Sequence, residues 1–236
     1  MTVFHPAGSR GHAQHGWLDS HHTFSFAQYY DPTRIHFGAL RVLNDDLVAG
    51  GMGFGRHPHD NMEIVSIPLA GDLEHRDSMG NVGVIRQNDV QIMSAGTGVE
   101  HSEHNKNGDR PVSFLQIWVM PKIKNIVPRY DQKHFEPSAR ENKWQQIVSP
   151  EKDSEGVWIN QDAWFHLGKF KPGFSTEYAV HQKGNGVYAF VLEGEVDLGG
   201  QRLARRDGFG IWDVERFAVT AIAEAELLLI EVPMAI

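Results

Sequence analysis

The sequence predicts an all-β protein that folds as two small barrels in one chain, with few short helices. Segments rich in Val, Ile, Leu, Phe and Trp recur along all 236 residues, and each ends at Gly, Pro or an Asn-Asp or Asp-Gly pair. This pattern of short apolar segments ended by turn-forming residues is typical of short strands separated by tight turns. Helical periodicity is weak throughout, and a chain of this length has room for two domains of roughly 110 to 120 residues.

The strands expected along the chain alternate with polar turns. Asn44-Asp45-Asp46 and Met79-Gly80-Asn81 are expected to be turns, because Asn and Asp tolerate left-handed backbone and Gly adopts it without steric cost. The clearest strand candidates, in chain order, are Ala39–Leu43, Met62–Leu69, Gln91–Ser94, Phe114–Met120, Val187–Leu192, Phe217–Ile222 and Ala225–Val232.

The two halves of the chain resemble each other, which predicts that one barrel unit occurs twice. In the first half Ile64–Leu73 leads to Asn88–Met93, and in the second half Val187–Val196 leads to Arg206–Trp212. An internal repeat of one strand-turn-strand unit explains both copies. We therefore expect a first barrel over residues 1–120, a connecting segment over 121–152, and a second barrel over 153–236 on which N-terminal residues can also pack.

Composition and charge exclude several classes of function. The net charge is −8 without a run of basic residues, so we expect no direct binding to nucleic acid. The chain has no cysteine, which excludes disulfides, thiolate metal ligands and cysteine nucleophiles. No apolar run approaches the roughly 20 residues needed to span a bilayer, and no secretory signal is evident, so we expect a cytoplasmic protein without membrane contact.

Histidine is the one unusual component, with 14 residues in the chain. Two glycine-rich stretches, Gly51–Glu63 and Gly96–Asn105, place ligand-type residues two positions apart, as His57-Pro58-His59 and His101-Ser102-Glu103. In a strand such residues point to the same face, so each pair converges. Three imidazoles and one carboxylate meeting inside a barrel would bind one divalent transition metal and leave positions open for water or substrate.

The spacing of these residues resembles the two sequence motifs of the cupin superfamily, whose members are small jelly-roll barrels. The first motif matches Gly51, His57, His59, Glu63 and Gly71, and the second matches Gly98, His101 and Asn105. The chain departs from the usual motifs in three places. Gly71 lies one residue further from Glu63, and Gly96 and Val90 stand where a proline and a glycine are usual.

The distance to Gly71 decides which carboxylate is expected to bind the metal. Counted back from Gly71, the usual carboxylate position falls at Ile64, so we expect Glu63 to point away from the metal and Glu103 to replace it. His104 follows Glu103 directly in the same strand, so its side chain should face the other way.

A second resemblance extends over essentially the whole chain. Arg10–Phe26, Tyr29–Pro32, Phe54–His59 and Ile92–Gly98 together resemble the pirin family, particularly its bacterial members. The resemblance implies a bicupin whose first barrel alone holds the metal, through His57, His59, His101 and Glu103. It also implies quercetin 2,3-dioxygenase activity, with which members of the family are associated, while a mammalian member is associated with nuclear transcriptional co-regulation.

The second half of the chain agrees with a single metal site. Counted back from Gly194 as from Gly71, Val180 and Gln182 stand where His57 and His59 stand in the first half, and no histidine follows His181. We expect the second barrel to lack metal ligands and to be structural.

The function that this resemblance implies is that of a mononuclear metal dioxygenase, an oxidoreductase that opens the central ring of flavonols such as quercetin and releases carbon monoxide. Glu103 would be both metal ligand and catalytic base for the 3-hydroxyl. The partners are then a small aromatic substrate and dioxygen. We expect the protein to be a monomer, and binding of a protein partner stays an open alternative. Iron is the expected ion, although nickel, copper, cobalt, manganese and zinc also suit three nitrogens and one oxygen.

Two other functions would use the same residues. A metal- or redox-dependent regulatory protein could use the site as a switch, because oxidation of bound iron changes the local charge. Another metal-dependent cupin reaction, such as an isomerisation, stays open because fold and ligands do not determine the substrate. An aromatic pocket open to water beside the metal favours the dioxygenase, and a sealed or very small one favours the others.

The remaining candidates are histidines and aromatic residues, most of them near the N-terminus. We expect His12, His15, His21 and His22 on the surface or behind the metal ligands, rather than in a second metal or proton-relay site, because their spacings share no single face. Core packing, with one or two residues able to line an aromatic pocket, is expected for Trp17, Phe24, Phe26, Trp118 and Met120.

Overall fold

The computed structural model describes residues 1–235, and within them strands make up almost all of the regular structure. The all-β prediction is therefore confirmed. The helical elements in that range are two short 3-10 turns, η1 (Ala7–Ser9) and η2 (Pro137–Arg140). No helix of the described chain is long and apolar enough to cross a membrane.

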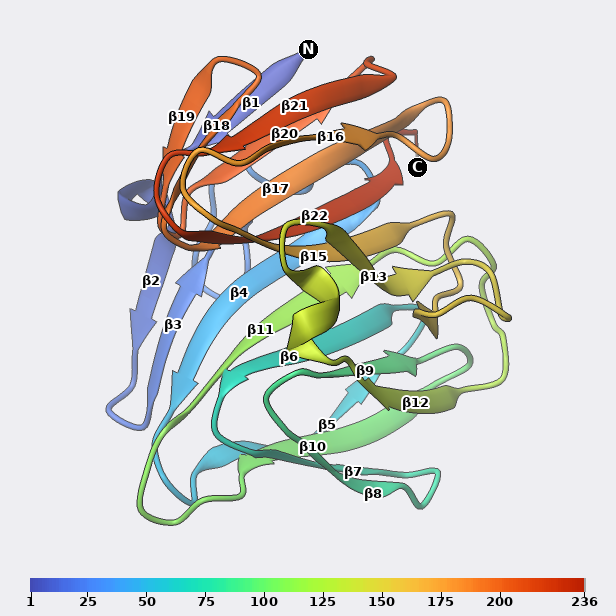
Figure 1. The fold of residues 1–236 in the computed structure, drawn as a ribbon. Coiled ribbons are helices and arrows are strands. Elements are labelled where there is room, and N and C mark those ends of the chain that lie inside the picture. The colour runs from blue at the N-terminus through green and yellow to red at the C-terminus, as the bar shows by residue number, and fades with distance from the viewer. Residues whose placement is uncertain (236) are drawn as a thin grey trace.

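The strands form four sheets, which pair into the two predicted barrels (Figure 1). In the first barrel the large sheet contains, in spatial order, β12 (Arg129–His134), β9 (Asp89–Ser94), β6 (Glu63–Ala70), β11 (Val112–Val119), β4 (Leu40–Val48), β3 (Leu18–His22) and β2 (Gly11–Gln14). Its small sheet contains β5 (Gly53–His59), β10 (Val99–Asn105), β7 (Leu73–Asp77) and β8 (Val82–Ile85).

The second barrel repeats this spatial order of strands, although the strand pair at one edge of its large sheet is parallel and the corresponding pair of the first barrel is antiparallel. Its large sheet contains, in spatial order, β1 (Thr2–His5), β20 (Gly208–Trp212), β17 (Asn185–Glu193), β22 (Ala225–Pro233), β15 (Trp164–Phe170), β13 (Trp144–Ser149) and β14 (Val157–Trp158). Its small sheet contains β16 (Ser175–Ala179), β21 (Arg216–Ala221), β18 (Glu195–Leu198) and β19 (Gln201–Ala204). Because the two orders correspond, the repeat expected from the sequence is present in the fold.

Two edge strands come from outside the sequence block of their own barrel. The N-terminal strand β1 pairs with β20 of the second barrel, where Figure 1 shows it in blue among the orange strands. Its counterpart in the first barrel is β12, which pairs with β9 and lies in the segment 121–152. That segment also supplies β13 to the second barrel, so it connects the two barrels and contributes one strand to each. The division at residues 120 and 153 stays a prediction.

The two large sheets pack against each other through a shared apolar layer. Val65, Ile67 and Ile117 of the first barrel belong to the same buried cluster as Phe165 and Leu228 of the second. Strand alternation explains this layer, because every second residue of a large sheet faces the other barrel and the residues between them face the barrel interior. The interior faces therefore determine where a site can form.

One predicted turn is instead the middle of a strand. Asn44, Asp45 and Asp46 lie within β4, which pairs with β3 and β11 without interruption at this point. Asn44 and Asp46 are buried and face the interior of the first barrel, which is polar here, so a turn-like composition occurs inside a strand. The turn expected at Met79-Gly80-Asn81 is present, with Gly80 at a φ of 93°.

Candidate metal centre

The three predicted histidine ligands meet where β5 pairs with β10. His57 lies directly opposite His101, and His59 follows on the same face of β5. The ring centroids of His57 and His101 are 4.5 Å apart, and each of these rings lies 4.8 Å from that of His59. One nitrogen from each ring can be chosen so that all three lie within 4.8 Å of one another. The three imidazoles thus converge as the spacing in the sequence predicts.

Local backbone features allow β5 to approach β10 so closely. A side chain at Gly53 would meet the Glu103 carbonyl at 2.3 Å, so only glycine fits there. A β-bulge interrupts the pairing between His101 and Glu103. Next to it the Gly55 carbonyl accepts a hydrogen bond of 2.7 Å from His57 Nδ1, which fixes the tautomer and leaves Nε2 free.

Glu103 lies two residues beyond His101 on the buried face of β10, at the inner end of the site. Its Oε1 accepts a hydrogen bond of 2.9 Å from Ser66 Oγ, and its Oε2 accepts one of 2.6 Å from Gln116 Nε2. The carboxylate forms a second close group with His101 and His75, so His101 is the residue common to both groups. An ionised carboxylate has about four lone-pair positions, so these two bonds leave Glu103 able to bind a further partner.

The unpartnered nitrogens of His101 show that this donor set fits a metal ion. Both Nδ1 and Nε2 of His101 are buried and lack a hydrogen-bond partner within the described chain. A buried polar atom without a partner costs about 1–3 kcal/mol, which an ion bound to one nitrogen would remove. Burial lowers the pKa of His101 to about 3 and that of His59 to about 4, with the neighbouring histidines adding to both shifts. The rings are therefore neutral near pH 7, the form that binds metals.

His75 is a site residue that the sequence reasoning missed. It lies on β7 opposite Glu103, is fully buried, and places its ring 5.3 Å from that of His101. Its Nε2 lies 3.1 Å from an Asp77 carboxylate oxygen, while Nδ1 has no partner. The alternation Leu73-x-His75-x-Asp77 was the available signal, because it places all three residues on one face of a strand.

Glu63 and His104 lie away from the cluster, as the register arithmetic predicts. The Glu63 carboxylate is buried on the opposite face of β6, where it accepts bonds from Ser94 Oγ at 2.7 Å and from the Asn160 backbone at 3.1 Å. Burial raises its pKa to about 7. Ile64 faces the barrel interior instead and packs with Met93. His104 belongs to none of the close ligand groups in the described chain.

Two cavities adjoin the histidines. An open one of about 790 Å³ is lined by His57, His59, Met62, Val99 and Trp118. A smaller one of about 200 Å³ extends toward β3 and β4, and its lining also includes His57 and Trp118. Its other members are Leu18, Phe26, Phe54, Glu103, Gln116, Asp46, His15 and His22, among others. The site is therefore open to water on one side and bounded by aromatic and polar side chains on the other.

The aromatic residues expected in the core divide between core and cavity. Phe24 is buried in the layer between the barrels, against which Met120 packs, and Trp17 packs on the smaller cluster around Leu18. Trp118 and Phe26 line the smaller cavity. The Trp118 ring lies 4.9 Å from the His59 ring and 5.4 Å from that of Phe26.

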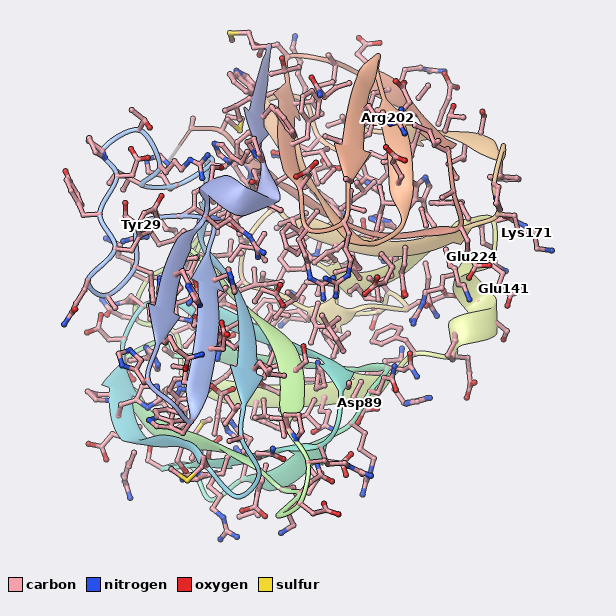
Figure 2. The ribbon with its side chains drawn as sticks, turned by 90° about the vertical axis from the view of Figure 1, so that its left-hand side faces the viewer. Tyr29, Asp89, Glu141, Lys171, Arg202 and Glu224 are labelled. Atoms are coloured by element: carbon pink, nitrogen blue, oxygen red, sulfur yellow. The ribbon has the colours of Figure 1, made fainter. Side chains whose placement is uncertain are left out.

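The loop between β3 and β4 forms part of the wall of the smaller cavity, through Phe26 and Ala27. Figure 2 looks onto β2 and β3 and labels Tyr29 on this loop beside them. Only glycine fits at position 11 of β2, because a Cβ there would lie 2.3 Å from the Tyr29 ring. The loop thereby brings Phe26 toward Trp118.

The second barrel has neither histidine nor carboxylate at the equivalent positions. Phe217 lies opposite Tyr178 as His101 lies opposite His57, and Val219 lies opposite Leu198 as Glu103 lies opposite His75. The equivalents of His57 and His59 are therefore Tyr178 and Val180, rather than the Val180 and Gln182 counted from Gly194. The segment between β16 and β17 spans 180–184, whereas that between β5 and β6 spans only 60–62, so the count is displaced by two residues.

Comparisons with known proteins agree with this architecture. Residues 3–119 match the family model described as pirin, and residues 146–232 match the one described as the quercetinase C-terminal cupin domain. Quercetin 2,3-dioxygenase of Escherichia coli strain K12 is 42% identical over 235 residues, which are 99% of each chain. A pirin-like protein of Caulobacter vibrioides is 40% identical over 227 residues, 96% of this chain and 97% of the relative.

A solved structure extends the similarity to the whole backbone. The crystal structure of the bacterial pirin YhhW of Escherichia coli in complex with nickel(II) matches with a TM-score of 0.93 and 39% identity. The match covers 99% of both chains.

Proposed function

Because the chain belongs to the pirin family of two-barrel cupin proteins, we propose that it is a metal-dependent dioxygenase that opens the central ring of flavonols such as quercetin and releases carbon monoxide. The observation that carries the proposal is the cluster of three converging imidazoles beside Glu103, at an open cavity partly lined by Trp118. Two relatives that are 42% identical to this chain are named quercetin 2,3-dioxygenase, which supports the choice of substrate class.

We propose that His57, His59, His101 and Glu103 hold one divalent transition metal ion. The unpartnered nitrogens of His101 and the free Nε2 of His57 support this ligand set. Three nitrogens and one oxygen suit several first-row ions, of which we propose iron as the native one. Nickel is the first alternative, because the related YhhW was crystallised with nickel(II).

The reaction requires a base, a fixed substrate and access for dioxygen. A bound ion would supply Lewis acidity that lowers the pKa of the substrate's 3-hydroxyl. Glu103 takes the proton of that hydroxyl, and Ser66 and Gln116 keep its carboxylate oriented toward the histidines. The electron-rich flavonolate then reduces dioxygen. Both oxygen atoms remain in the ring-opened product, and the carbon between the two broken carbon–carbon bonds leaves as carbon monoxide.

The cavity supports a small-molecule reaction over a purely regulatory site. An aromatic ring entering beside His59 would lie against Trp118, which has an apolar face, while the volume of about 790 Å³ leaves the metal position accessible from water. A redox switch that binds a protein partner would not need such a cavity. Partner capture that changes on metal removal or oxidation, in a protein without flavonol turnover, would favour the regulatory function instead.

The test is carbon monoxide release from quercetin under air. Protein stripped of metal and reconstituted with iron or nickel is incubated with quercetin, and carbon monoxide and ring-opened product are both quantified. We expect about one carbon monoxide per quercetin consumed and no release from His101→Ala. His104→Ala, three residues further on the same strand, is the matched control and should retain turnover. Absence of both products, or equal release from His101→Ala, would falsify the proposal.

A further inference from the structure

A second group of metal-ligating side chains lies on the hairpin formed by β2 and β3. His12 on β2 lies directly opposite His21 on β3, and Asp19 lies on the same face two residues before His21. Ser20 and His22, the alternate residues of β3, face the cavity of the first barrel instead. The two imidazole rings stack, with centroids 4.5 Å apart and planes inclined by 16°. Cross-strand pairing thus joins histidines whose sequence spacing suggested no common face.

The distances from Asp19 to the two imidazoles in this hairpin cluster match those around a single ion. Asp19 Oδ1 lies 2.9 Å from His12 Nε2 and 3.4 Å from His21 Nδ1. All three ligand atoms lie within 4.8 Å of one another. Metal bonds of about 2.0–2.2 Å to imidazole and carboxylate place neighbouring ligand atoms of one ion about 3.0–3.4 Å apart. Because an imidazole binds a metal in the plane of its ring, an ion can bind here once the two rings rotate out of their stacked arrangement, without a change of backbone.

We propose that His12, Asp19 and His21 form a second metal site, distinct from the cavity of the first barrel. Two imidazoles and one carboxylate suit borderline divalent ions such as Zn²⁺, Ni²⁺ and Cu²⁺ rather than Mg²⁺ or Ca²⁺. The three side chains retain between 34% and 50% of their accessible surface, so water completes the coordination and the ion exchanges readily. The site shares no residue with the cluster of His57, His59, His101 and Glu103.

The position of the hairpin site connects it to the contact between the barrels. Asp45 on β4 lies opposite His21, and its carboxylate binds Arg10 at 3.3 Å and Arg206 at 2.8 Å. Arg206 belongs to the second barrel, so this ion-pair network joins the two barrels next to the hairpin. Occupancy of the hairpin site adds positive charge beside Asp45 and Arg10, and therefore acts on this contact rather than on the cavity.

The experiment measures Zn²⁺ binding to the full chain with the cavity site removed. In a His59→Ala/His101→Ala background stripped of metal, titration calorimetry should detect one equivalent of Zn²⁺. Adding His12→Ala or His21→Ala should weaken that binding at least about tenfold, since even loss of a residue behind a metal ligand costs about 10- to 100-fold. His134→Ala is the matched control, because His134 also pairs with a carboxylate, Asp89 at 2.7 Å, but has no second imidazole.

A parallel titration avoids dependence on the cavity variants. The otherwise unmodified chain should bind two equivalents of Zn²⁺, and His12→Ala/His21→Ala should bind one. Cu²⁺ bound to the cavity-deleted protein should give an electron paramagnetic resonance spectrum with coupling to imidazole nitrogen, lost in His12→Ala/His21→Ala. Unchanged Zn²⁺ affinity in the hairpin variants, or an effect of His134→Ala as large as theirs, overturns the proposal. Turnover of quercetin is not a readout, so failure here is separate from failure of the proposed function.

Discussion

The two barrels have the same strand order but different interiors. One continuous apolar cluster fills most of the second barrel, from Val187 and Val196 to Phe217 and Leu229, and a polar group around Glu231 lies at its mouth. In the first barrel the apolar residues form two smaller clusters, one around Leu18 and one around Ile64. The histidines and polar residues of the site, among them Glu103, Gln116, Asn44 and Asp46, face the interior that the two clusters leave unfilled.

The residues at a few equivalent strand positions determine whether a barrel interior contains a polar cluster or an apolar core. His101, Glu103 and His75 correspond to Phe217, Val219 and Leu198, in strands that pair in the same register. The apolar residues stabilise the second barrel through burial, at about 1.5–3 kcal/mol for each large side chain. The polar residues of the first barrel forgo that gain, and hydrogen bonds together with the proposed metal ion would satisfy their buried atoms.

The largest expected effect comes from His101→Ala, which removes the residue common to both ligand groups. We expect the affinity of the first barrel for Ni²⁺ or iron to fall by at least about 100-fold and turnover to disappear with it. Metal content after gel filtration and quercetin consumption are the measurements. The second barrel should remain folded, as judged by unchanged hydrogen exchange in β17 and β22. Full metal content in His101→Ala would contradict the ligand assignment.

The next effect separates the two buried carboxylates of the first barrel. Glu103→Gln should lower kcat by about 10²- to 10⁴-fold, because it removes the proposed base as well as one proposed metal ligand. Glu63→Gln is the matched control, since Glu63 is equally buried but faces Ser94 and Asn160 on the other side of the sheet. Turnover numbers per bound metal ion compare the two. Similar losses in both variants would show that burial, rather than position, explains the effect.

Glu63 itself is expected to make stability depend on pH. Burial raises its pKa from the ordinary value of 4.5 to about 7. The stability it contributes is therefore fully present below about pH 4.5 and is lost as the pH rises through 7. A shift of this size is worth about 3 kcal/mol, so Glu63→Gln should gain up to about that much over the unmodified protein between pH 5 and pH 8. Urea unfolding of both proteins at pH 5 and pH 8 measures this gain. An equal change in the free energy of unfolding between the two pH values in both proteins would contradict the prediction.

The smallest effect concerns the polar group at the mouth of the second barrel. Glu231 is fully buried and accepts a hydrogen bond of 2.9 Å from the Tyr178 hydroxyl, as well as bonds from the backbone of His181 and Gln182. Tyr178→Phe should lower the free energy of unfolding by about 1.5–3 kcal/mol, since it removes one bond to a charged acceptor. Metal content and turnover should not change. A loss of turnover without a loss of stability would instead indicate a catalytic role for the second barrel.

The fold class and the arrangement of most residues in the candidate site could be predicted because both depend on local patterns. Alternation along a strand was enough to bring His57 and His59 to one face and to place Glu103 on the same face as His101. The count back from Gly71 against the cupin motif turned Glu63 away. Packing of N-terminal residues on the second barrel was expected, but the pairing partners of the edge strands β1 and β12 could not be predicted, because that pairing joins segments far apart in the chain. The turn predicted at Asn44–Asp46 was wrong, because the residue types that favour turns also suit a strand that faces a polar barrel interior.

The residues that were missed depend on pairing between strands. His75 is one residue in a mixed polar segment, and only its position opposite Glu103 brings it to the site. His12 and His21 have a spacing that suggests no common face, and only the hairpin register places them opposite each other. Trp118 faces the cavity because its strand alternates, although its composition alone is that of a core residue.

Anomalous diffraction from crystals of the nickel-loaded protein, recorded on both sides of the nickel absorption edge, tests the difference between the barrels most directly. We expect a peak within about 2.0–2.2 Å of one nitrogen each of His57, His59 and His101 and of one Glu103 oxygen. We expect none inside the second barrel. A peak among His166, His181 and Glu231, or an ion in the first barrel that leaves Glu103 bonded only to Ser66 and Gln116, would contradict this assignment.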